Sequence, residues 1–212
     1  MKLKTALFLV MNGFASLTSS MAQSNIIQIS NQQKKVAITY SSAESKLAAE
    51  ILYSYLEKSL PNTFEIKDKN ITKSDAQIIL EIQKNNKELK DQEFILKSNS
   101  QDISLLATNL KSLKYAVYTL LEKWEFRKFT ATVSYIPKPD AFIFPKNFYQ
   151  KYQPTFAYRT LLYPDSYDQA FREWHKLDWF NDDFGLWGHT FDRLVPPKTH
   201  FKTNPKLYAL YE

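Results

Sequence analysis

The chain has 212 residues, of which 44% are hydrophobic and 24% charged, and it carries a formal net charge of +6. It contains no cysteine, which excludes disulfides, thiolate metal ligands and a cysteine nucleophile. A positive balance is common in nucleic-acid-binding proteins. The lysines here are instead spread through polar segments rich in Asn and Gln, so we interpret them as a solvated surface and expect no nucleic-acid partner.

Residues 1–22 have the pattern of a secretory signal peptide. Lys2 and Lys4 precede an apolar run, and small residues lead to Ala22, after which we expect cleavage. Removal of the two lysines lowers the net charge to +4. The prediction is an exported protein, located in the periplasm, at the cell surface or outside the cell. No later apolar run reaches the roughly 20 residues of a transmembrane helix, so none is expected in the mature chain.

Residues 23–130 predict a compact domain that begins with a strand and a helix. The run 36–40 is rich in residues that favour strands. Ser41-Ser42-Ala43-Glu44 offers an N-cap with an acid three residues on, so we expect a helix from there to Pro61. The apolar positions of this helix recur at three- and four-residue steps and predict one buried face. They are Leu47, Ala48, Ile51, Leu52, Tyr55, Leu56 and Leu60.

The same domain continues with short strands and a second helix. Strands are expected at 64–67, 76–82, 93–97 and 102–107, and a helix at 110–124. The order β-α-β-β-β-β-α predicts an α/β (α+β-like) domain, with a mixed sheet and two helices on one face. Its apolar residues are explained as core, and the domain shows no catalytic constellation.

After Phe129 the composition changes, because eight of the nine prolines fall from Pro137 onward. We interpret 131–154 as a proline-rich connector. A second unit is expected over 155–212. It would open with a strand at 155–159 and continue with a short amphipathic helix at 168–178.

The candidate site lies in the loop around Trp187. Gly185 and Gly188 flank this tryptophan, and the remaining glycine lies in the predicted leader. In a chain with so little glycine, these two indicate a special backbone geometry or the close approach of a ligand. All three histidines lie in this part of the chain, but His175 and His200 lack a ligand-like spacing with His189, so no metal site is expected. Asp182 and Asp183 are adjacent carboxylates on a loop, which favours solvation or a turn.

Two sets of motifs resemble known families. LKYAVYTLLEK at 113–123, followed by Phe126-Arg127, resembles the helix that closes the N-terminal domain of family 67 alpha-glucuronidases and the related accessory domain of beta-hexosaminidases. FAYR at 156–159, WGHTFDRLVP at 187–196 and NPKLYAL at 204–210 resemble the entry to the catalytic barrel of the domain-of-unknown-function 4838 proteins. The resemblance covers nearly all of the mature chain.

The resemblance implies that the accessory domain precedes a glycosidase-like (β/α)8 barrel. Such a barrel needs on the order of 250 residues, so we expect 155–212 to hold only its incomplete beginning, without the catalytic carboxylate pair. The apolar side chains of this segment would then be exposed. We expect this of Phe156, Leu161, Leu162, Trp179 and Phe191.

The resemblance also supplies the candidate substrate contacts. Arg159 corresponds to a strand-end arginine that holds sugar hydroxyls, and its alternative is an ion pair with Asp165 or Asp168. Trp187 presents a ring face to a sugar or plugs the barrel mouth. His189 binds a hydroxyl, positions a carboxylate or is structural. Tyr208, in the tail, is expected in the core.

The sequence departs from the family patterns at three positions. Glu125 stands where the family helix ends in glycine, so we expect a different cap. Asn204 replaces the usual histidine before the tail proline, and Lys206 replaces an acid.

Taken together, the sequence predicts the N-terminal segment of a secreted glycoside hydrolase-like protein that acts on polysaccharide and is similar to alpha-glucuronidases. This segment would be inactive alone and would need no cofactor. The alternative is a non-catalytic protein that binds carbohydrate or another surface.

Overall fold

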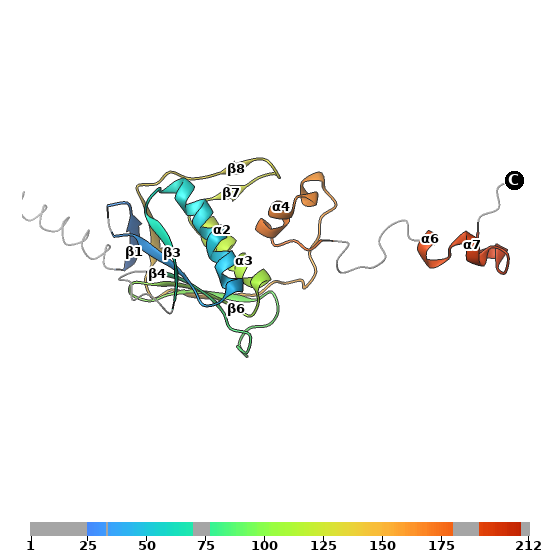
Figure 1. Ribbon diagram of the computed structural model, residues 1–212, viewed down its shortest axis with the longest axis horizontal. Coiled ribbons are helices and arrows are strands. Elements are labelled where there is room, and N and C mark those ends of the chain that lie inside the picture. Colours follow the sequence, from blue (N-terminus) through green and yellow to red (C-terminus); the bar gives the residue numbers. More distant parts are fainter. Residues whose placement is uncertain (1–24, 33, 70–76, 180–190, 209–212) are drawn as a thin grey trace, which may run out of the picture. The chain divides into compact units, whose positions relative to one another are not determined.

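The computed structural model describes residues 25–32, 34–69, 77–179 and 191–208 (Figure 1). The chain divides into two compact units, Met1–Ala157 and Tyr158–Glu212, and each is described by itself. No helix among the described residues is long and apolar enough to cross a membrane.

The first unit contains a six-stranded mixed sheet of order β10-β5-β6-β4-β2-β3. Strands β3, β2, β4 and β6 are parallel to one another, whereas β5 is antiparallel to both of its neighbours, β6 and β10. The strands are β2 (Val36–Tyr40), β3 (Phe64–Asp68), β4 (Gln77–Ile82), β5 (Phe94–Ser98), β6 (Ile103–Ala107) and β10 (Tyr149–Tyr152). The α/β class and the mixed sheet are therefore confirmed.

Helices α2 (Ala43–Ser59) and α3 (Leu110–Lys123) cover one face of this sheet (Figure 1). They pack against each other and both contact β4, which places them on the same side. The prediction of two helices on one face is thus confirmed. The predicted inner face of α2 was wrong at Leu47, which is exposed, because the helix turns Ser45 and Ala49 inward instead.

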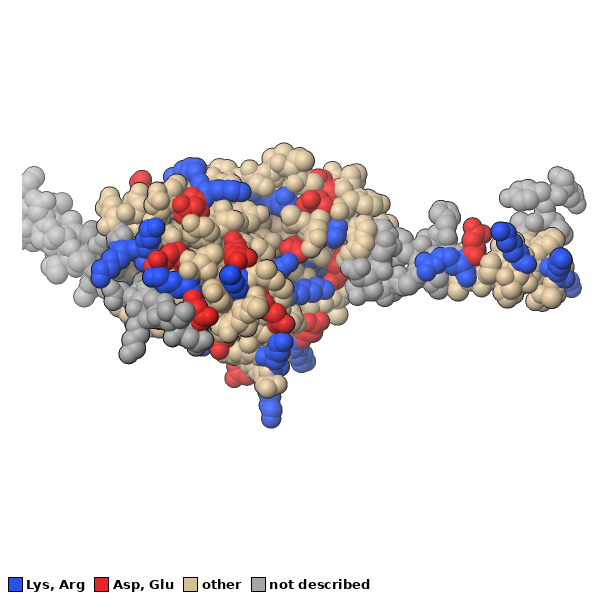
Figure 2. Space-filling view, in the orientation of Figure 1, with Lys and Arg blue, Asp and Glu red and all other residues tan. Residues whose placement is uncertain are grey.

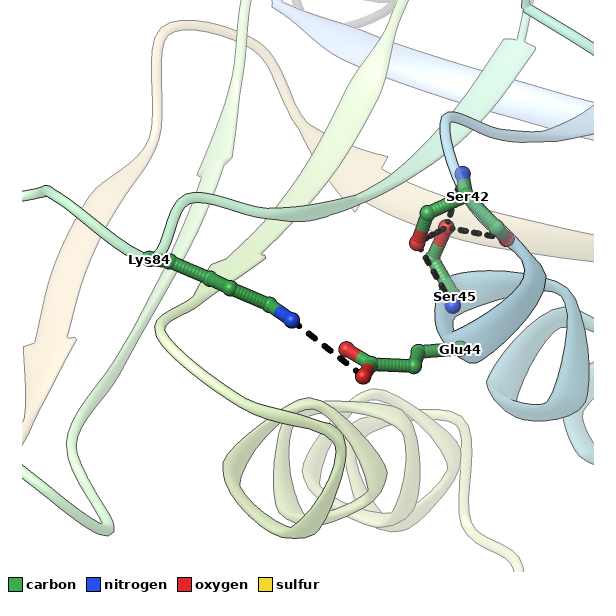
Figure 3. A network of polar contacts seen from close by, with 4 residues as sticks. All are labelled: Ser42, Glu44, Ser45 and Lys84. Atoms are coloured by element: carbon green, nitrogen blue, oxygen red, sulfur yellow. Dashed lines mark hydrogen bonds and ion pairs between the residues drawn. The ribbon is translucent and has the colours of Figure 1, made fainter.

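The N-terminus of α2 has the expected serine N-cap, but the residue three positions on is Ser45 and not the acid Glu44 (Figure 3). Ser42 is the N-cap, and its hydroxyl accepts from the N–H of Ser45 at 3.1 Å. The Ser45 hydroxyl in turn accepts from the N–H of Ser42 at 2.9 Å, which closes a capping box. Glu44 instead lies 3.3 Å from Lys84, in the turn after β4.

The C-terminus of α3 ends in a left-handed residue, Glu125, with φ of 67°. The N–H of Phe126 donates to the carbonyl of Leu121 at 3.1 Å, and that of Glu125 donates to Glu122 at 3.1 Å. These two bonds define a Schellman motif. The expectation of a different cap was wrong: the chain keeps the geometry that glycine favours and places a glutamate in it.

We predict that Glu125→Gly stabilises the first unit by about 1 kcal/mol, because the left-handed conformation costs a residue with a Cβ more than it costs glycine. Glu125 is exposed, so no packing is lost. Chemical denaturation measures the change. Glu125→Ala is the matched control: equal stabilisation by alanine would assign the gain to removal of a negative charge near the helix C-terminus.

The segment expected as a connector, 131–154, contributes strands to the first unit. It contains β8 (Ser134–Tyr135), which pairs with β7 (Arg127–Lys128), and β9 (Ala141–Pro145), which pairs with β1 (Ile26–Ser30). It also supplies β10, the edge strand beside β5. Its prolines lie between or at the ends of these short strands, where no ladder N–H is needed.

Strand β9 contributes the centre of an aromatic cluster. The Phe142 ring stacks on Trp124 at 4.7 Å and on Phe126 at 5.9 Å between ring centroids. The Trp124 indole N–H donates to the carbonyl of Ile143 at 3.0 Å. This cluster joins the end of α3 to the β1–β9 pair, so residues on both sides of position 130 share one core.

A buried carboxylate joins the 83–93 loop to β10. Glu93 is 2% exposed, and its Oε2 lies 2.8 Å from Lys151 Nζ and accepts from the N–H of Lys90 at 2.9 Å. Burial by itself raises the pKa of Glu93, but the bonds from Lys151 and Lys90 outweigh it and the pKa lies below its usual value.

Glu93→Gln is expected to lower the free energy of unfolding at pH 7 by about 2 kcal/mol, since a charged hydrogen bond is lost. A lowered folded-state pKa stabilises the fold above the unfolded value of about 4.3, and this contribution is lost as the pH falls through the folded value. The variant should therefore lose less stability than the wild type below about pH 4.3. Urea unfolding at several pH values measures both effects, with the exposed Glu88→Gln as control. Equal acid sensitivity of wild type and Glu93→Gln would contradict this assignment.

Within its described residues, the second unit forms short helical segments. They are η1 (Pro164–Tyr167), α4 (Gln169–Trp174), α6 (Phe191–Leu194), α7 (Pro197–His200) and η2 (Pro205–Leu207). The helix expected at 168–178 is shorter because Lys176, with φ of 58°, turns the chain just after it. The strand expected at 155–159 is not formed. A strand requires a partner strand that bonds to its N–H groups and its carbonyls, whereas the N–H of Arg159 donates to the side chain of Asp178 and only its carbonyl accepts from the Asp178 backbone.

Candidate functional site

Arg159 is held to the chain that follows α4 by three hydrogen bonds. Its N–H donates to Asp178 Oδ2 at 2.9 Å, and the N–H of Asp178 donates to the Arg159 carbonyl at 2.6 Å. The Arg159 Nε donates to the carbonyl of Lys176 at 2.9 Å. Both the backbone and one side of the guanidinium are therefore fixed.

Asp178 is the residue that sequence reasoning missed at this position. It is buried, and its carboxylate accepts the hydrogen bond from the Arg159 N–H that the carbonyl of a neighbouring strand would otherwise accept. The ion pair considered for Arg159 involved Asp165 or Asp168. Asp168 caps α4, where its Oδ1 accepts from the N–H of Phe171 at 2.6 Å. No motif marks Asp178, because its role depends on a contact made 19 residues away.

The other two predicted contacts, Trp187 and His189, lie outside the described residues, as do Asp182, Asp183 and both flanking glycines. Their roles stay predictions. Within the described part of the chain, no group of three or more His, Cys, Asp or Glu side chains is arranged to hold a metal. Tyr208 is half-buried, and its hydroxyl donates to the carbonyl of Val195 at 2.9 Å.

A second group of side chains, missed from the sequence, surrounds Trp179. The Arg172 guanidinium lies over the Trp179 ring at 4.4 Å, and the Tyr167 ring meets Trp179 edge-on at 5.4 Å. Arg172 also donates from Nη1 to the carbonyl of Ser166 at 2.7 Å. The residues are separated by seven and twelve positions, which gives no periodic signal.

The expected exposure of apolar side chains after Pro154 is confirmed at Phe156, Leu161, Leu162 and Phe191. Trp179 differs, because Arg172 and Tyr167 cover part of its ring and leave it half-buried. The charges of the first unit are mixed: Figure 2 shows cationic and anionic side chains interspersed on the viewed face. This agrees with a solvated surface on that face.

Comparison with known families matches part of the chain. Residues 128–212 match the family model described as "Domain of unknown function (DUF4838)". The resemblance noted in the sequence is thereby confirmed for this part of the chain. The match begins at β7, so it includes the strands β8, β9 and β10 that complete the first unit. Comparison with curated protein sequences gives no match.

Solved structures similar to the chain include glycoside hydrolases. One is a GH20 exo-beta-N-acetylglucosaminidase from Vibrio harveyi, with 18% identity, 64% of this chain and 18% of that chain covered, and a TM-score of 0.42. Another is a family GH115 4-O-methyl-alpha-glucuronidase with specificity for decorated arabinogalactans, with 18% identity, 64% and 19% covered, and a TM-score of 0.45. A third is a GH138 enzyme targeting pectin rhamnogalacturonan II, with 11% identity, 43% and 10% covered, and a TM-score of 0.34. The chain spans less than a fifth of the length of each.

Proposed function

We propose that the chain is the N-terminal segment of an exported glycoside hydrolase-like protein, and that its second unit contacts a polysaccharide substrate. Arg159, Trp187 and His189 are the proposed contacts. The proposed activity of the whole protein is alpha-glucuronidase-like hydrolysis of O-glycosyl bonds. That chemistry requires two carboxylates, one acting as general acid and the other as base or nucleophile. We assign neither to this segment.

The observation that carries the proposal is the fixation of Arg159. A guanidinium whose Nε is committed to the Lys176 carbonyl has a defined orientation. Its planar, forked donors suit paired sugar hydroxyls or a carboxylate. The same unit presents exposed aromatic side chains, and sugar C–H groups pack well on aromatic faces. The motifs that resemble the barrel entry support this interpretation.

Binding of oligosaccharides to the full chain tests the proposal. Titration calorimetry with cellohexaose, xylohexaose and galacturonohexaose should detect binding of at least one of them. Arg159→Ala should weaken it by about 2 kcal/mol, the scale of a charge-assisted hydrogen bond. Arg193→Ala removes an exposed arginine of α6 and is the matched control. Binding that is unaffected by Arg159→Ala would refute the proposed role.

The second candidate is a non-catalytic protein that binds carbohydrate or another surface. The exposed Leu161 and Leu162, which are adjacent in the chain, favour it, because exposed apolar surface marks interaction sites. Release of reducing sugar from glucuronate-containing polysaccharide by the whole protein separates the two candidates. Binding without release would favour the second.

A further inference from the structure

The loop around η1 holds its shape through its own hydrogen bonds. The Ser166 hydroxyl donates toward the carbonyls of Leu161 and Tyr163, at 2.6 and 2.7 Å. The N–H groups of Ser166 and Asp168 close the turn at 2.9 and 3.1 Å. Arg172 adds a bond from Nη1 to the Ser166 carbonyl. The backbone of this loop is therefore satisfied locally, although side chains on it point to solvent.

Tyr167, the last residue of η1, is the exposed aromatic that this arrangement positions. It is 64% exposed, and its ring meets Trp179 at 5.4 Å and an interplanar angle of 71°. The Arg172 guanidinium carbon lies over the Trp179 ring, 4.4 Å from its centroid. A ring that is already ordered loses little conformational freedom when a ligand packs on it.

We propose that Tyr167 and Arg172 form a carbohydrate subsite that takes one pyranose ring of an oligosaccharide on the face of Tyr167. The C–H groups of a pyranose pack on an aromatic face. The Arg172 guanidinium lies over the Trp179 ring at 4.4 Å, and it carries five N–H donors, of which one serves the Ser166 carbonyl. In the proposed subsite, a sugar hydroxyl beside Tyr167 accepts a hydrogen bond from one of the other N–H groups of the Arg172 guanidinium. The inference rests on the proposed function and adds a contact separate from Arg159.

Calorimetric titration of the full chain with the three hexasaccharides tests the subsite. Tyr167→Ala is expected to weaken binding about tenfold, or ~1.4 kcal/mol. Tyr167→Leu should do the same, because it keeps apolar volume and removes the flat ring. Tyr167→Phe should retain wild-type affinity within about twofold, since stacking needs the ring and not the hydroxyl. Tyr163→Ala is the matched control: it lies in the same loop, is 57% exposed and should also leave the affinity unchanged.

Two results would overturn the subsite while sparing the proposed function. The first is that Tyr167→Ala and Tyr167→Leu both bind with wild-type affinity, whereas Arg159→Ala has lost binding. The other is an equal loss in Tyr163→Ala, which would indicate a general apolar surface rather than a defined ring platform. If the wild-type chain binds none of the hexasaccharides, the proposed function fails and the subsite with it. Circular dichroism of each variant shows that the fold is kept.

Discussion

A chain shortened to residues 23–157 is expected to fold cooperatively, whereas one shortened to 23–130 is not. Removal of 131–157 takes away β8, β9 and β10, leaves β1 without its partner strand and deprives the Trp124 indole of the Ile143 carbonyl. Loss of buried Phe142 and Phe144 costs about 3–5 kcal/mol each. Because a domain is stable by only about 5–15 kcal/mol, the shorter chain should be largely unfolded.

Thermal unfolding followed by circular dichroism, together with amide dispersion in NMR spectra, distinguishes the two shortened chains. Limited proteolysis of the full chain is a second check, because a resistant product should end near Ala157, where the first unit ends. A cooperative transition in the 23–130 chain would show that the domain folds without β8, β9 and β10. A resistant product that extends to Glu212 would contradict the division into two units.

Phe142→Ala should destabilise the first unit by about 3–5 kcal/mol, which is the cost of removing a buried ring and leaving a cavity. The side chain is 2% exposed and stacks on both Trp124 and Phe126. The neighbouring Ile143 is 56% exposed on the other side of the same strand, so Ile143→Ala is the matched control and should change stability by no more than about 0.5 kcal/mol. Urea denaturation measures both. A small effect at Phe142 would mean that the β1–β9 pair is dispensable for the core.

Local patterns were sufficient to predict the elements from 36 to 124. The strands and helices there fall within one or two residues of the expected bounds, since alternation, caps and helical steps are encoded nearby. Strands β1 and β9 were missed because Ile29 pairs with Phe142, a partner more than 100 residues away that no short-range pattern reveals. The same limit explains the strand wrongly expected at 155–159.

In the candidate site, too, the sequence predicted local features and missed contacts between residues far apart in the chain. The residue type at Arg159 and the family motifs pointed to sugar contact, and these signals lie in the sequence itself. The partner Asp178 and the group formed by Tyr167, Arg172 and Trp179 depend on how the chain turns after α4. That turn is set by Lys176 in a left-handed conformation. Lysine is not a residue that favours this conformation, so the sequence gives no signal for the turn.

A crystal structure of the chain with a bound oligosaccharide is the most direct measurement of the central claim. We expect Arg159, Trp187 and His189 to line one hollow, with the sugar within hydrogen-bonding distance of the Arg159 guanidinium and packed on an aromatic face. Side chains that lie far apart and face away from any shared cavity, or a sugar bound elsewhere on the chain, would contradict it.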